Sequence, residues 1–211
     1  MMLEKQFVIT IARGYGSGGR HIGKALAEEL GVHCYDRKLL RLASDESGIN
    51  EGLFGLADEN PSLKMLLPIA RRERGGEIIP PDREDFVSNE NLFRYQAKVI
   101  TELAKSESCV VIGRCADYVL RGVPNVLRVY IHAPLEDCSR RVSEMNSIPL
   151  EAARRLVQIT DKRRAAYYAY FTGSSWKNAD NYDLCLDSSS FGHEKCVQMI
   201  REYLKIKLSV L

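Results

Sequence analysis

The chain of 211 residues is 45% hydrophobic and 27% charged, and its formal net charge is +2. This composition is ordinary for a globular protein with one sizeable core, and the nearly balanced charge provides no overall field that would attract a nucleic acid or a membrane surface. No apolar run approaches the roughly 20 residues of a membrane helix. The start, "MMLEKQFVITIA", lacks the pattern of a signal peptide. We therefore expect neither a nucleic-acid partner nor a membrane partner.

The six cysteines form no C-x-x-C pair and no zinc-binding spacing. Several of them lie within apolar segments, which favours reduced thiols in the core of a cytoplasmic protein. The six positions are Cys34, Cys109, Cys115, Cys138, Cys185 and Cys196.

The first part of the chain predicts a strand, a glycine-rich loop and a helix. Residues 6–12, "QFVITIA", are apolar and β-branched, as in a buried strand. After the glycines, Ile22, Leu26 and Leu30 recur at helical spacing, and Gly31 is a stop signal. A short second strand at 32–35 and a helix over about 37–46 follow.

Residues 47–90 differ in composition from the rest of the chain. They hold four of the seven prolines, a Gly-Gly pair and the charged cluster "RRERGGE" at 71–77. We predict an insertion of short helices and mobile loops. A helix resumes near residue 90, with one face formed by Phe93, Ala97, Ile100 and Ala104.

The second half of the chain predicts three more strands, at 109–113, 126–133 and 182–187. A helix after the fourth strand is marked by Leu135, Cys138, Val142 and Met145, and a long charged helix covers 149–170. The terminal helix carries the apolar stripe Val197, Ile200, Leu204 and Leu208. Strands that alternate with helices indicate a parallel sheet covered on both faces.

A glycine-rich stretch, "ARGYGSGGRHIG" at 12–23, joins the first predicted strand to the first predicted helix. Gly14 and Gly19 stand at the glycine positions of the phosphate-loop pattern G-x-x-x-x-G-K-[ST]. Gly16 and Gly18 allow positive φ angles, so that successive N–H groups can face inward beside the positive N-terminus of a helix. We predict an anion-binding loop; the alternative is a glycine turn that holds no ligand.

The last two positions of the pattern are not lysine and a hydroxyl residue. Arg20 keeps the positive charge, and a guanidinium can contact two phosphate oxygens at once. His21 cannot replace a hydroxyl as a ligand of Mg²⁺. Ser17 is the hydroxyl residue of the loop itself. The pattern therefore predicts phosphate binding and leaves the metal ligands undefined.

Polar residues follow two other predicted strands, and ligands of open α/β sheets bind at the carboxyl ends of strands. Arg114 directly follows the third strand, where it would face the ligand or, alternatively, solvent at the start of a helix. Asp36, Arg37 and Arg41 follow the second strand. These three hold an acceptor phosphate or, alternatively, form a capped and charged helix.

The long charged helix carries a cluster of ionisable residues: Arg154, Arg155, Asp161, Lys162, Arg163 and Arg164. Such a run is often a solvated face. Its high charge and few apolar anchors also suit a mobile cationic lid over a phosphate site. The aromatic residues that follow are predicted to pack this helix on the sheet, with base stacking as the alternative role. They are Tyr167, Tyr168, Tyr170, Phe171 and Trp176.

Five stretches together resemble the cytidylate kinase-like family of the nucleoside monophosphate kinases. They are "ITIARGYGSGGRHIGKALAEELGVHCYDRKLL", "VVIGRCADYVL", "VYIHAPLEDCSRRV", "DKRRAAYYAYFTGSSW" and "NYDLCLDSS". The resemblance covers most of the chain and is weakest at 50–90. It implies a three-layer P-loop NTPase fold with a five-stranded parallel sheet, helices on both faces, a monophosphate-binding insertion and a helical lid.

The resemblance also implies one kinase domain over 1–211. Its core would be 1–48, 91–148 and 180–211, its insertion 49–90 and its lid 149–179. The implied reaction is ATP-dependent transfer to a nucleoside monophosphate, CMP or dCMP, with Mg²⁺. The donor phosphates would lie on Gly14, Tyr15, Gly16, Ser17, Gly18, Gly19, Arg20 and His21.

The family motifs carry roles to further positions. Asp161 and Arg164 match the D-x-x-R of the lid and, with Arg20, would be catalytic. Arg154, Arg155 and Arg163 would belong to the lid, and Asp36, Arg37, Arg41 and Arg114 would bind the acceptor.

The sequence departs from true cytidylate kinases at Arg20 and His21, and at Cys115, where they have aspartate after "GR". Two alternatives therefore stay open: a nucleotide-binding module without catalysis, and a kinase of a different small acceptor.

Overall fold

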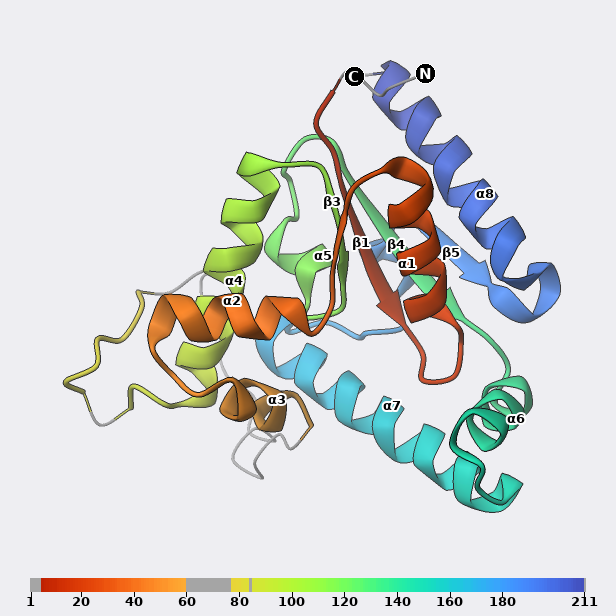
Figure 1. Cartoon of the computed structure of the whole chain (residues 1–211), viewed down its shortest axis with the longest axis horizontal. Helices are drawn as coiled ribbons and strands as arrows, with labels where there is room; N and C mark the ends of the chain where they lie inside the picture. Colours follow the sequence, from red (N-terminus) through yellow and green to blue (C-terminus); the bar gives the residue numbers. More distant parts are fainter. Residues whose placement is uncertain (1–4, 60–76, 84, 211) are drawn as a thin grey trace.

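A computed structural model describes residues 5–59, 77–83 and 85–210 (Figure 1). It contains one five-stranded sheet in the order β2-β3-β1-β4-β5, and all neighbouring strands are parallel. The strands are β1 (Val8–Arg13), β2 (His33–Tyr35), β3 (Cys109–Ile112), β4 (Val126–His132) and β5 (Leu184–Asp187). The predicted five-stranded parallel sheet is confirmed.

The helices alternate with the strands as predicted. They are α1 (Gly19–Leu30), α2 (Lys38–Ser47), α3 (Glu51–Glu59), α4 (Asn89–Ser106), α5 (Ala116–Val119), α6 (Leu135–Asn146), α7 (Leu150–Thr172) and α8 (Ser188–Val210), with a 3₁₀ turn at Ala179–Asn181. A non-helical backbone at Gly192 separates the first turn of α8 from the rest of that helix.

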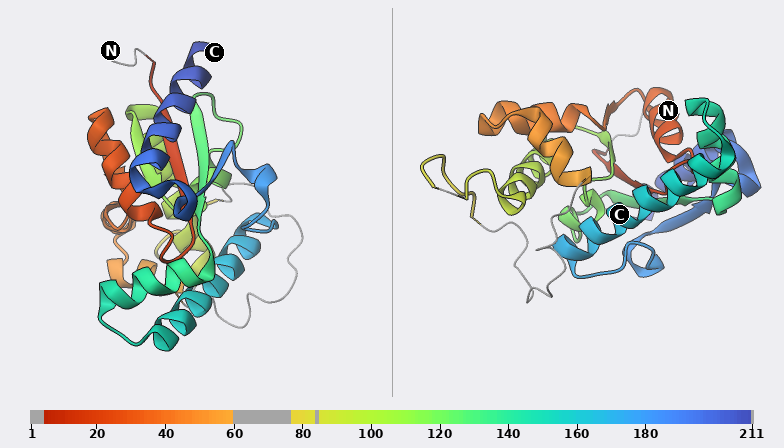
Figure 2. Two further views of the ribbon diagram at one scale, coloured as in Figure 1. Left: turned by 90° about the vertical axis from the view of Figure 1, so that its right-hand side faces the viewer. Right: turned by 90° about the horizontal axis from the view of Figure 1, so that it is seen from below.

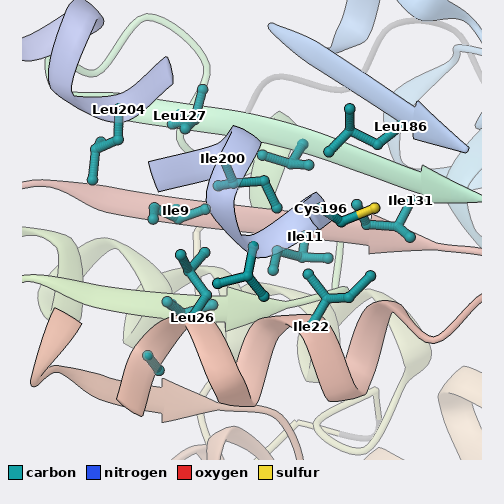
Figure 3. Packing of buried hydrophobic residues seen from close by; sticks show 14 of the residues in the cluster. Ile9, Ile11, Ile22, Leu26, Leu127, Ile131, Leu186, Cys196, Ile200 and Leu204 are labelled. Carbon is teal, nitrogen blue, oxygen red and sulfur yellow. The ribbon is translucent and has the colours of Figure 1, made fainter. Parts of the chain in front are cut away.

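Helices α1 and α8 cover one face of the sheet, and the core between them is entirely apolar (Figure 3). Ile9 and Ile11 of β1 pack there against Ile22 and Leu26 of α1, and all four side chains are fully buried. Burying each such side chain contributes about 1.5–3 kcal/mol. This packing holds the start of α1 at the carboxyl end of β1.

The opposite face is covered by α2, α4 and α5, with Phe54 of α3 buried in the same cluster. Nearer the carboxyl ends of the strands, an aromatic cluster joins α7 to the sheet. Within it, Tyr130 of β4 stacks on Tyr182 at 5.1 Å between ring centroids, and Phe93 of α4 stacks on Phe171 of α7 at 4.1 Å. The predicted packing role of the aromatic residues is confirmed.

Helix α7 runs across the end of the molecule toward which the arrow of β1 points (Figures 1 and 2). This is the end where the loop between β1 and α1 lies. The same helix therefore faces both the glycine loop and the residues that follow β3, which is the arrangement that a cover for that end of the sheet requires.

Some expectations were wrong in detail. Met145 is 68% exposed, because it lies in the last turn of α6, beyond the cluster in which Cys138 and Val142 pack. Cys185 is exposed on the edge strand β5, and Cys34 is only partly buried, whereas the other four cysteines are core thiols. The short helix α5 was not predicted. Within the predicted insertion, residues 60–76 and 84 lie outside the described residues.

Within the part of the chain that the structure describes, no helix is long and apolar enough to cross a membrane.

Candidate phosphate-transfer site

The loop between β1 and α1 turns on glycines with positive φ. Gly16 and Gly18 both have φ 79°, and Gly18 is the N-cap of α1 without any side-chain hydrogen bond. A Cβ on Gly16 would lie 2.6 Å from the backbone oxygen of Cys138. Only glycine fits both the backbone conformation and this close approach. The loop is therefore a specific structure and not a generic flexible turn.

Several N–H groups of this loop have no acceptor within the described residues. The amides of Gly14 and Ser17 bond to the carbonyl oxygens of Ile131 and Gly14. By contrast, no described residue accepts a hydrogen bond from the amides of Gly16, Gly18, Arg20 and His21. The last two lie in the first turn of α1, where the helix dipole favours an anion.

Hydrogen bonds from distant segments hold the loop in place. The Ser17 hydroxyl is buried and donates to the Gly14 carbonyl oxygen at 2.8 Å. Ser188, at the start of α8, donates to the Ser17 carbonyl oxygen at 2.5 Å. Arg141 of α6 donates to the Gly16 carbonyl oxygen at 3.3 Å and to Ser188 Oγ at 3.0 Å. Ser17 thus builds the loop. Arg141 and Ser188 were not singled out from the sequence.

The outer side of the loop packs against a histidine that was also not predicted. The ring of His193 lies so close to Gly18 that a Cβ there would overlap its Nε2. That nitrogen is buried and has no hydrogen-bond partner among the described residues. Burial, with Arg141 and His21 nearby, lowers the pKa of His193 and so favours its neutral form. His21 itself is exposed, with its ring 5.2 Å from that of His193.

Four guanidinium groups come together at this end of the sheet. They belong to Arg13 of β1, Arg20 of α1, Arg114 after β3 and Arg164 of α7, and each interacts electrostatically with others of the set. Among the described residues, the carboxylates of Asp36 and Asp161 attract the Arg13 guanidinium. A gathering of guanidinium groups of this kind produces a positive potential that favours an anionic ligand.

Burial perturbs the ionisation of these groups. It lowers the pKa of the Arg13 guanidinium to about 9, with the positive Arg164 acting in the same direction. It lowers the pKa of Arg114 to about 10, and it also lowers the pKa of Arg164. Burial raises the pKa of Asp161, against the hydrogen bond that its carboxylate accepts. Perturbed groups gathered at one place are typical of functional sites.

Helix α7 contacts the loop through Asp161 and Arg164. The Tyr15 amide donates to Asp161 Oδ1 at 2.8 Å, and Arg164 Nη1 donates to the Arg13 carbonyl oxygen at 3.1 Å. The Arg164 guanidinium also lies over the Tyr15 ring, 5.5 Å from its centroid. Asp161 and Arg164, which were predicted as lid residues, therefore both contact the segment around the glycine loop.

The other predicted lid arginines lie away from the loop. Arg154 forms an ion pair with Glu136 of α6 at 2.5 Å. Arg155, Lys162 and Arg163 are exposed and make no ion pair within the described residues. For these positions the structure shows a solvated face of α7.

Of the four residues predicted to bind the acceptor, only Asp36 and Arg114 lie at the arginine cluster. The side chain of Arg20 is 53% exposed and pairs with Asp36 at 2.5 Å. Arg37 and Arg41 are exposed on α2, which begins without a side-chain cap. Arg114 instead is partly buried within the arginine cluster, in a turn where Gly113, Arg114 and Cys115 all have positive φ. Strained non-glycine residues of this kind often mark functional positions.

The sequence matches the model of the cytidylate kinase-like family over residues 8–190. It is 27% identical over 210 residues to a cytidylate kinase of Methanopyrus kandleri, covering 95% of this chain and 94% of the relative. A cytidylate kinase of Methanobrevibacter smithii is 29% identical over 138 residues, which cover 65% of this chain and 78% of the relative.

Solved structures share the fold. A crystal structure of a protein from Eubacterium ventriosum superposes with a TM-score of 0.69 at 23% identity, over 95% of this chain and 99% of the other. A shikimate kinase from Acinetobacter baumannii, in complex with shikimate, gives 0.53 at 14% identity, over 96% and 94%. The fold is thus that of the P-loop kinases. Because the family model spans most of the chain, this protein belongs to the cytidylate kinase-like family.

Proposed function

We propose that this protein transfers a phosphoryl group from ATP to a nucleoside monophosphate, CMP or dCMP. One observation carries the proposal: amides of a glycine loop and helix N-terminus that no described residue satisfies lie at the same end of the sheet as a group of guanidinium side chains. Phosphoryl transfer needs positive charge and alignment more than covalent chemistry. The matching relatives named cytidylate kinase support the choice of acceptor.

Each part of the site has a task in this reaction. The amides of Gly16, Gly18, Arg20 and His21 would bind oxygens of the donor polyphosphate. Arg114 would bind the acceptor phosphate, because it follows a neighbouring strand at the same edge of the sheet. Arg164 would bridge the loop and α7 and would exclude water when nucleotide is bound. These roles place donor and acceptor phosphates side by side across the carboxyl end of the sheet.

Mg²⁺ would be held largely by the nucleotide. Within the described residues no three His, Cys, Asp or Glu side chains form a metal cluster. Mg²⁺ in kinases needs only one or two carboxylates besides phosphate oxygens and water, so the residues fit such an ion. Among the described residues, Asp36 and Asp161 are carboxylates that interact with Arg13 of the arginine cluster. The metal would neutralise charge on the polyphosphate.

The direct test measures ADP release with ATP, Mg²⁺ and a panel of nucleoside monophosphates. We expect the highest kcat/KM with CMP or dCMP. Gly18→Ala should lower kcat/KM about a hundredfold, because its Cβ would overlap His193 and shift the loop. Arg201→Met, which removes surface ion pairs of α8 with Glu29 and Glu202, is the control and should have the kcat/KM of the wild type. ATP binding without turnover on any acceptor would contradict this proposal and indicate a nucleotide-binding module.

A further inference from the structure

Arg13 lies in a space that two glycines leave open for it. It is the last residue of β1, directly before the loop. A Cβ on Gly19 would lie 2.5 Å from Arg13 Cβ, and a Cβ on Gly113 would overlap Arg13 Nη1. The stem of the side chain therefore passes the first residue of α1, and its guanidinium reaches the turn after β3. Any larger residue at either glycine would displace it.

This guanidinium has no hydrogen-bond acceptor among the described residues. Arg13 is partly buried, yet its side chain makes no hydrogen bond and no ion pair with any described residue. The neighbouring Arg164 and Arg20 repel it, and the attraction of Asp36 and Asp161 does not restore its ordinary pKa, which falls to about 9. A guanidinium offers five donors, and leaving them unmatched away from bulk water is costly. This arrangement is suited to binding an anionic ligand.

The position of Arg13 lies between the two halves of the site. On one side is Gly19, the first residue of α1, next to the unsatisfied loop amides. On the other side is Gly113, the neighbour of Arg114. Arg20, by contrast, projects outward and is paired with Asp36. Of the two arginines that flank the loop, Arg13 is the one directed at the point where donor and acceptor phosphates would meet.

We propose that Arg13 is a catalytic residue that binds the phosphoryl group in transfer, supplying the charge that the lysine of a phosphate loop usually provides. The inference rests on the proposed function. In the step, an oxygen of the acceptor phosphate forms a bond to the terminal phosphorus of ATP. The bond from that phosphorus to the bridging oxygen breaks, and ADP leaves with the electron pair. Arg13 keeps its protons and stabilises the charge on the equatorial oxygens.

The test compares Arg13→Met, which keeps an unbranched stem, with Arg13→Lys, which keeps the charge. Arg20→Met tests whether the other arginine that flanks the loop also binds phosphate. Arg201→Met is the control for the loss of one surface arginine. Each full-length protein is titrated calorimetrically with ATP and with inorganic tripolyphosphate. Its melting temperature is measured without ligand, and its kcat is measured with the best acceptor.

A ligand-binding role predicts that binding and stability change in opposite directions. Arg13→Met should weaken tripolyphosphate binding at least tenfold and lower kcat by about a hundredfold or more. Because an unmatched cation is removed, the same change should raise the ligand-free melting temperature by about 2–4 °C. Arg13→Lys should fall between this variant and the wild type, and Arg20→Met should lose less binding than Arg13→Met.

Two results would overturn the assignment. One is an Arg13→Met protein that binds tripolyphosphate as tightly as Arg201→Met. The other is an Arg20→Met protein that loses as much binding as Arg13→Met. A wild type that binds neither ATP nor tripolyphosphate would instead remove the proposed function, so the two failures are distinguishable.

Discussion

Arg114 has an unfavourable backbone conformation, and its side chain lies in the arginine cluster. Its φ is 61°, and the following Cys115 has φ 53°. A left-handed conformation costs an L-residue about 1–2 kcal/mol, which glycine avoids. The turn keeps this strain while it directs a guanidinium into the arginine cluster. Strain held at one residue in this way is expected where position matters more than stability.

Two substitutions separate the backbone from the side chain at this residue. Arg114→Gly and Arg114→Ala both remove the guanidinium, so both should raise the KM for the acceptor at least tenfold while ATP binding changes little. Arg114→Gly should be more stable than Arg114→Ala by about 1 kcal/mol, because only glycine relieves the strain. Urea unfolding and steady-state kinetics measure the two effects. Equal acceptor KM in both variants and the wild type would exclude Arg114 from the acceptor site.

Several residues at the glycine loop could not be predicted from local sequence patterns. The spacing of Gly14 and Gly19 predicts that Arg20 is the phosphate-binding cation of the loop. In the structure Arg20 is paired with Asp36 at the surface. Arg13 ends a strand of apolar residues and matches no motif position, so only the space beside Gly19 and Gly113 reveals it. His193 and Ser188 contact the loop across more than 170 residues of chain, and no local pattern predicts such a contact.

At the level of elements, all five strands and the long helices were predictable, and the short helix α5 was not. β1, β3 and β4 are apolar runs between turn signals, and α1 has its stop at Gly31, which adopts φ 65°. α5 has four residues, too few for a helical period to show. Cys185 alternates like its neighbours, yet β5 is an edge strand, so its side chain meets solvent.

The edge strand β5 is tied to the sheet by one network of charges. Asp183, just before β5, accepts hydrogen bonds from the backbone and side chain of Arg128 on β4, at 2.8–3.2 Å. Lys207 of α8 pairs with the same carboxylate at 3.1 Å. Burial alone would raise the pKa of Asp183, but the hydrogen bonds from Arg128 and Lys207 outweigh it and hold the pKa below its ordinary value.

Asp183→Asn should therefore destabilise the protein by about 2 kcal/mol at neutral pH. A carboxyl with a lowered folded pKa contributes stability above its unfolded pKa of about 3.9, and this contribution is lost as the pH falls toward the folded value. The difference in unfolding free energy between the wild type and Asp183→Asn should be constant from about pH 7 to pH 5 and should shrink below about pH 4. Urea titrations across this range measure it. A difference that does not depend on pH would show that the charge of Asp183 is not responsible.

In the whole molecule, the hydrophobic core and the proposed phosphate site occupy different regions. The core between α1 and α8 is built from hydrophobic side chains (Figure 3). The carboxyl end of the sheet instead gathers arginines and amides that no described residue satisfies. α7 crosses that end and touches the loop through Asp161 and Arg164. Polyphosphate binding should therefore protect backbone amides at this end of the sheet much more than amides in the core.

Residue-resolved hydrogen exchange tests this division. In the free protein the amides of Gly16, Gly18, Arg20 and His21 should exchange fast, because no described residue accepts from them. Saturating ATP should slow them at least tenfold, since phosphate oxygens become their acceptors. The Val8 amide bonds to the Asn125 carbonyl oxygen at the other end of β1 and serves as the internal control. Slowing at Val8 but not in the loop would mean that ATP binds elsewhere or acts only through global stability.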